Sequence, residues 1–145
     1  MCGMLLGGDS NSRGEQPMTK NQGYPGYYSL IQFMPCPSRA EAINVGVVLS
    51  CSYFEYLGTN TIPDSHIAKT AERLVGRGNV DKALLIAAKN AIVHGLYEVV
   101  SFDNPYSFRQ FAATRTGILR LTLPRSVKVF EPRQEIQRLF DELVF

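Results

Sequence analysis

The spacing of apolar residues changes from a period of two to a period of about 3.6 along this chain. Three strands are predicted first, over residues 27–34, 43–50 and 53–57, because β-branched and aromatic residues gather there. The second strand is the most apolar, which favours a place near the centre of a sheet. Proline lacks a backbone N–H, so Pro35-Cys36-Pro37 ends the first strand, and residues 38–42 are expected to form an elbow or a single helical turn.

Three later segments repeat apolar residues with helical spacing. The first covers residues 64–75, between the start signal Pro63-Asp64-Ser65 and Gly76. The second covers residues 79–99, and the third covers residues 133–144. The apolar stripe of the third helix is formed by Ile136, Leu139, Phe140, Leu143 and Val144. This helix is amphipathic, so we expect it to dock on the sheet or on a partner.

The remaining segments complete the expected order of elements. Residues 101–116 are interpreted as a long irregular stretch, and residues 118–123 alternate as a half-buried strand does. Pro124 interrupts that strand, and residues 127–130 are a possible extension at the sheet edge. The order β-β-β-α-α-β-α predicts an α+β fold: a small antiparallel or mixed sheet of about four strands, with helices packed on one face.

Composition predicts one domain behind a short leader. Residues 1–26 are rich in Gly, Asn, Ser, Gln and Pro and are expected to be a disordered leader, with Met18 as an alternative start. Residues 27–145 then form a single domain. The chain begins without a basic segment or a long apolar run, so neither a signal peptide nor a membrane span is expected. Its three cysteines show no Cys-x-x-Cys spacing, which favours reduced thiols in a cytoplasmic protein.

The formal net charge of +2 says less than the distribution of charge. The segment from Pro105 to Phe130 contains no Asp or Glu. Its cations are Arg109, Arg115, Arg120, Arg125 and Lys128. Such an excess can contact phosphate or an acidic partner. The plainer interpretation is a set of solvated charges that discourage pairing at an edge strand.

Arg39, Glu41 and Asn44 are the strongest candidates for a partner- or ligand-binding site, at the elbow before the central strand. A phosphate or carboxylate would suit the planar guanidinium of Arg39. The alternative is a surface pair between Arg39 and Glu41, with the Asn44 amide satisfying backbone groups at the start of the strand. This alternative is favoured.

No pattern for catalysis, metal binding or a cofactor accompanies these residues. His66 and His94 lack the spacing of a zinc site, and no phosphate-binding glycine loop occurs. Cys36 is displayed between two prolines, but no base is near it in sequence, so an inert thiol is favoured. We therefore expect no catalytic residues, no metal and no cofactor, and a non-enzymatic protein is favoured over an enzyme.

Two blocks of sequence resemble a bacterial family known as domain of unknown function 3037. The first block joins YSLIQF at residues 28–33 to PSRAEAINVGVVL at residues 37–49. The second is GILRLTLPR at residues 117–125, followed by the final helix. The resemblance covers about residues 27–144 and implies a fold without a settled activity. Relatives often carry an aspartate where this chain has Cys36. The family's genes often lie beside those of kinase-like proteins of the toxin–antitoxin type, which implies such a protein as a partner.

The sequence and the family resemblance leave three hypotheses for the function of this protein. The first is an accessory module that binds another protein, which the kinase-like neighbour and the apolar final helix favour. The second is a nucleic-acid-binding regulator that uses the basic residues of the stretch 105–130. The third is a small hydrolase or nuclease built on Arg39, Glu41 and Asn44.

Overall fold

A computed structural model describes residues 23–35, 41–76 and 78–144. Within these residues the chain forms a five-stranded antiparallel sheet with four helices packed against it, so the expected α+β class is confirmed. The strands are β2 (Tyr24–Phe33), β3 (Ile43–Cys51), β4 (Tyr56–Thr61), β5 (Leu119–Leu121) and β6 (Arg125–Val129). The helices are α1 (Asp64–Val75), α2 (Lys82–Val99), α3 (Pro105–Thr114) and α4 (Pro132–Leu143).

The sheet is built around β2. The strand order is β4-β3-β2-β5, and β6 pairs with the same side of β2 as β5 does. Residues 31–33 of β2 pair with β5, and residues 24–28 pair with β6. The chain thus forms one interrupted edge strand rather than two neighbouring ones. Pro124 lies at the interruption, as the sequence predicts, because proline cannot donate to the ladder.

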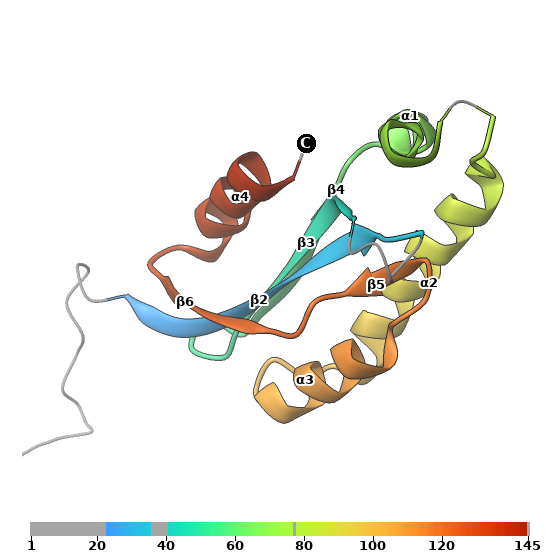
Figure 1. Cartoon of the computed structure of the whole chain (residues 1–145). Helices are drawn as coiled ribbons and strands as arrows, with labels where there is room; N and C mark the ends of the chain where they lie inside the picture. The colour runs from blue at the N-terminus through green and yellow to red at the C-terminus, as the bar shows by residue number, and fades with distance from the viewer. Residues whose placement is uncertain (1–22, 36–40, 77, 145) are drawn as a thin grey trace, which may run out of the picture.

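Helices cover both faces of the sheet, and this corrects the expectation of helices on one face. The Asn44 amide donates to the Leu143 carbonyl at the end of α4, so Asn44 and its cross-strand partner Gln32 define the α4 face. The opposite face bears Thr59 of β4, whose hydroxyl lies 3.4 Å from the Tyr97 hydroxyl of α2. Figure 1 shows α4 on one side of the sheet, with α2 and α3 on the other and α1 at its end.

A β-bulge in β3 changes which of its side chains share a face. Gln32 pairs with Asn44, whereas the preceding Ile31 pairs with Gly46, so Val45 is the extra residue. Simple alternation along the strand places Asn44 and Gly46 on one face. The bulge separates them: Asn44 lies on the α4 face, and Gly46 lies on the α2 face with Ile31.

Several strand boundaries differ from the expected ones, and the largest differences at strand starts are in the first and third strands. The first strand begins at Tyr24, three residues before the expected start, and the third begins at Tyr56 rather than Tyr53. Residues 52–55 form a turn in which Glu55 has a φ of 50°, so Tyr53 belongs to the turn. Tyr53 stacks on Tyr24 with 3.4 Å between the ring centroids. The aromatic run therefore covers the hairpin end instead of forming a strand. The rest of the expected leader lies outside the described residues.

The expectation of an irregular stretch over residues 101–116 is wrong, because α3 forms there. The Asn104 side chain accepts a hydrogen bond from the Tyr106 amide at 3.1 Å, and Pro105 occupies the first turn. Phe108 and Phe111 are buried on the face that meets the sheet and α2. Asn-Pro is a recognisable start signal, so the sequence did contain the information for this helix.

The other helices begin and end close to where the sequence places them. Asp81 caps α2 by accepting a hydrogen bond from the Leu84 amide, and Glu131 caps α4 through the Arg133 and Gln134 amides. The core lies on both sides of β3. Its fully buried side chains include Ile31, Val47, Val48, Leu49, Leu96 and Phe108.

Candidate functional site

The structure describes two of the three candidates at the elbow. Arg39 lies outside the described residues, and Glu41 is exposed. Asn44 is half-buried, and both ends of its amide are engaged: its oxygen accepts from Gln32 Nε2 at 2.8 Å, and its nitrogen donates to the Leu143 carbonyl at 2.8 Å. The amide therefore anchors the C-terminal end of α4 to the sheet. This is the plainer role of Asn44, in which it satisfies backbone groups.

Arg120 extends the polar row formed by Asn44 and Gln32. Its register partner is Gln32, so Asn44, Gln32 and Arg120 lie side by side on the α4 face across three strands. Its Nη1 lies 3.3 Å from the Met34 sulfur, and its buried Nε has no hydrogen-bond partner among the described residues. Arg120 is thus half-buried beside the end of the first strand and is a poor candidate for long-range contact with phosphate.

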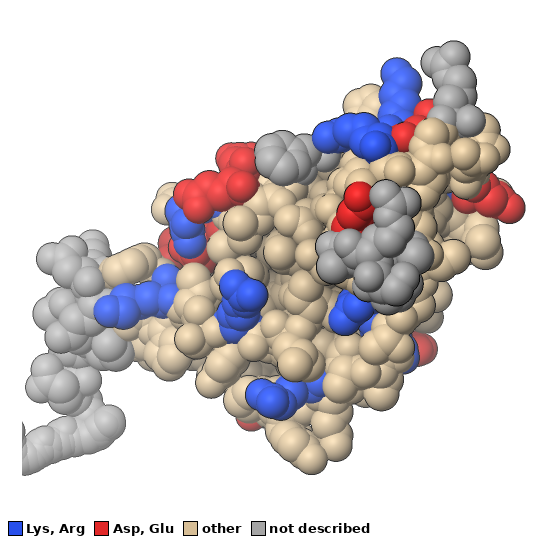
Figure 2. All heavy atoms as spheres, viewed as in Figure 1, with Lys and Arg blue, Asp and Glu red and all other residues tan. Residues whose placement is uncertain are grey.

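The five cations of the stretch 105–130 do not form one patch. Arg125 pairs with Tyr28 and lies on the α4 face, as Arg120 does, whereas Lys128 pairs with Pro25 and lies on the other face. Arg115 lies over the Phe111 ring, 4.2 Å from its centroid. Figure 2 shows Lys and Arg side chains spread along β6, β5 and α3 and separated by neutral surface.

A cleft of about 250 Å³ lies at this edge of the sheet, between β2 and the start of α3. Its lining is formed by Tyr27, Pro105, Tyr106, Arg109 and Pro124. Tyr106 is 64% exposed, and Leu123, which precedes Pro124, is 52% exposed. We use the term edge surface for this cleft together with Leu123 and Lys128, which lies on the same face of the sheet as Tyr27. It combines aromatic, apolar and basic side chains, and none of its residues is acidic.

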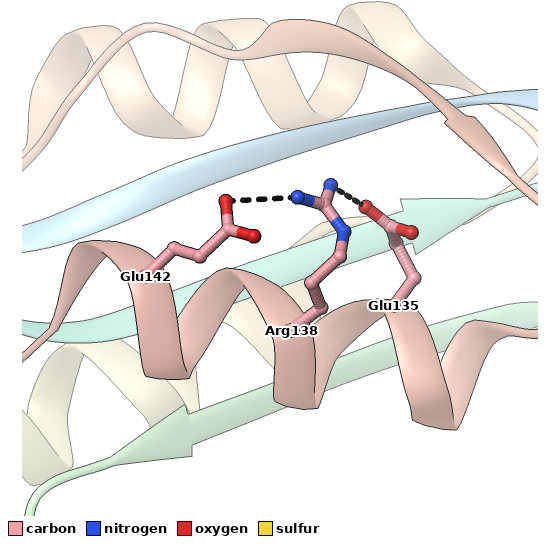
Figure 3. A network of polar contacts seen from close by, with 3 residues as sticks. All are labelled: Glu135, Arg138 and Glu142. Carbon is pink, nitrogen blue, oxygen red and sulfur yellow. Dashed lines mark hydrogen bonds and ion pairs between the residues drawn. The ribbon is translucent and has the colours of Figure 1, made fainter.

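Helix α4 carries its own charge network. In this network Arg138 is engaged by two carboxylates and is therefore a poor candidate for binding a ligand. Arg138 bonds to Glu135 and lies 2.9 Å from Glu142, as Figure 3 shows. The hydrogen bond that Arg138 donates to Glu135 is the main cause of the raised pKa of the Arg138 guanidinium. Two carboxylates around one guanidinium leave this network net negative, in contrast to the edge surface.

The described thiol and histidines show no sign of activation. Cys51 is buried and donates to the Pro25 carbonyl at 3.4 Å, and burial raises the pKa of its thiol. His94 is exposed and lies 3.4 Å from Glu98. Within the described residues, no three His, Cys, Asp or Glu side chains are placed to hold a metal. Cys2 and Cys36 lie outside that part of the chain.

The antiparallel sheet, interrupted at one edge and covered by helices on both faces, defines a small α+β domain. The chain belongs to the family described as Protein of unknown function (DUF3037), whose model matches residues 28–144. The resemblance carried by its two sequence blocks is confirmed. No curated protein and no solved structure matches the chain. None of the described helices is long and apolar enough to cross a membrane.

Proposed function

We propose that this protein is a non-enzymatic interaction module that binds an acidic segment of another protein through the edge surface. The observation that carries the proposal is the cleft in which Tyr27, Tyr106 and Arg109 meet two prolines. Tyrosine and arginine dominate the energetics of protein interfaces because they combine large contact area with directed hydrogen bonds.

The charge of the surroundings favours an acidic partner. Arg109 and Lys128 are exposed, and each lacks a carboxylate partner among the described residues. Complementary charge would speed association and select against basic partners. Kinase-like proteins of the toxin–antitoxin type are the first candidates to test, and a cytoplasmic location would suit reduced cysteines.

A catalytic role finds less support in the same residues. The Asn44 amide is engaged on both sides, and Glu41 is exposed rather than placed in a described cavity. A hydrolase or nuclease needs an acid, a base or a metal positioned in a shared pocket. The edge surface offers binding groups only.

The proposal is tested by affinity capture from the native host with the full chain as bait. The matched baits are the wild type, Arg109→Glu in the cleft, and Lys82→Glu, which makes the same charge change at an exposed position of α2. We expect one stoichiometric protein partner with the wild type and with Lys82→Glu, and its loss with Arg109→Glu. Recovery of no stoichiometric partner, or equal recovery with all three baits, would contradict the proposal.

Nucleic acid is the second candidate, because the exposed Tyr106 beside Arg109 also suits base stacking. Electrophoretic mobility shifts with single- and double-stranded DNA and RNA test it over a series of salt concentrations. Binding through phosphate contacts would weaken steeply as salt rises. Absence of binding at low salt would remove this candidate and leave the protein-binding proposal unaffected.

A further inference from the structure

A second hollow, of about 350 Å³, lies between α1 and α4 and shares no lining residue with the cleft of the edge surface. Its apolar lining is formed by Ile62 and Pro63, which precede α1, and by Phe140 of α4. Its polar lining comes entirely from α1 and consists of His66, Lys69, Thr70 and Arg73. No acidic residue is among them.

The three basic residues share one side of α1, because positions 66, 69 and 73 are spaced by three and four residues. The charges of Lys69 and Arg73, four residues apart, repel one another in the absence of a counter-ion. Arg73 Nη2 lies 3.5 Å from the hydroxyl of Thr70, which is itself 4% exposed. This contact places the guanidinium beside the Thr70 hydroxyl in the polar wall of the hollow.

The carboxylates of α1 do not neutralise this group. Asp64 forms an ion pair with Lys89 of α2 at 2.8 Å. Glu72 is outside the lining of the hollow. Figure 2 shows Lys and Arg side chains at the upper right of the molecule, where α1 lies, with acidic atoms directly beside them. The hollow therefore joins an apolar floor to a wall of three basic groups and one hydroxyl.

We propose that the hollow between α1 and α4 binds a phosphate or carboxylate group borne on a small apolar skeleton. Lys69 and Arg73 bind the anionic oxygens, with Arg73 presenting two parallel donors. Thr70 and His66 supply further hydrogen-bonding groups at the same wall. The apolar skeleton lies against Ile62 and Phe140, where its contact with water is lost.

The test is a titration of the full chain followed by two-dimensional ¹H–¹⁵N NMR. The probes are phenyl phosphate and benzoate, with benzyl alcohol as the neutral analogue and inorganic phosphate as the anion without a skeleton. We expect saturable shifts at the amides of α1 and of Phe140 with one or both aromatic anions, which also tells phosphate from carboxylate. Inorganic phosphate and benzyl alcohol should bind more weakly, because each lacks one half of the complementary chemistry.

Arg73→Gln should weaken binding of the preferred anion by about tenfold or more, the usual effect of losing a charge-assisted hydrogen bond. Lys82→Gln removes an equal charge from α2 and should leave binding unchanged. Both positions are exposed, so far-UV circular dichroism should show equal folding. Shifts that do not saturate, or that weaken equally in both variants, would overturn the proposal. Neither result bears on the edge surface, which the Arg109→Glu bait tests separately.

Discussion

Asn44 joins three elements through a single side chain. Its amide bonds to Gln32 of β2 and to the last carbonyl of α4, while its backbone belongs to β3. Its value for the fold therefore exceeds that of a surface amide, because losing it leaves a half-buried carbonyl and a half-buried amide without their partners.

We expect Asn44→Ala to lower the free energy of unfolding by about 1–3 kcal/mol, since two hydrogen bonds are lost and their partners stay half-buried. Urea denaturation followed by circular dichroism measures the change. Asn90→Ala is the matched control, because Asn90 is exposed on α2 and its loss should change stability by less than about 0.5 kcal/mol. Equal effects of the two substitutions would show that the Asn44 bonds contribute little.

Ser29 contrasts with Asn44, because its polar group is buried without a hydrogen-bond partner among the described residues. The whole residue is fully buried in β2. A buried hydroxyl without a partner costs free energy, so Ser29→Ala should leave stability unchanged or raise it by up to about 1 kcal/mol. Thermal denaturation of the two proteins provides the comparison. A loss of more than about 2 kcal/mol would reveal a bonded hydroxyl, for example through a buried water.

At the scale of elements, the bulge in β3 decides how the sheet and its helices fit together. Val45 is the extra residue, and it allows Asn44 to face α4 while Gly46 faces the other side. Gly46 then lies close to the neighbouring strand. A Cβ atom added there would lie 2.8 Å from Thr61 Cγ2 and 3.1 Å from the Asn60 carbonyl oxygen.

Gly46→Ala should therefore destabilise the protein by about 1–3 kcal/mol, because a backbone oxygen cannot move aside as a flexible side chain can. Gly117→Ala is the control within the same sheet region: the nearest atom to its added Cβ is 3.8 Å away. That substitution should be neutral or slightly stabilising, because alanine restricts the unfolded chain. Urea midpoints of the two variants measure the difference, and a tolerated Gly46→Ala would show that β3 and β4 can separate at little cost.

For the whole molecule, stability should fall at alkaline pH. Burial raises the pKa of the Cys51 thiol and of the Tyr56 hydroxyl above their ordinary values of 9.0 and 10.0. Each group keeps its proton in the folded protein at a pH where the unfolded chain has lost it. The stability that this proton binding contributes is fully present below the ordinary pKa and is lost as pH rises through the raised value.

The measurement is the free energy of unfolding at neutral pH and at about pH 10, where the unfolded groups ionise. We expect a decrease in the wild type and a smaller decrease in Cys51→Ala, which removes one of the two groups. If the free energy of unfolding decreases between the two pH values as much in Cys51→Ala as in the wild type, the thiol does not contribute.

Most of the helices and strands, and their order, could be predicted from the local pattern of apolar and polar residues. The apolar run of β3, the stop at the two prolines, the start of α1 and the amphipathic stripe of α4 each depend on neighbours within a few residues. Helix α3 was missed even though Asn104 and Pro105 mark its start, because its apolar residues are few. The sequence also showed that cations without acids occupy residues 105–130.

Tertiary structure decided what these residues face. Whether Asn44 meets a ligand or the end of α4 depends on a bulge and on a helix that begins 88 residues later in the chain. Whether five cations form one patch depends on strand register, which places Arg125 and Lys128 on opposite faces. The alternation along a strand indicates which residues share a face only while the register is regular. The sequence by itself therefore determined the fold class and most of the elements, and long-range pairing determined which of their residues lie side by side.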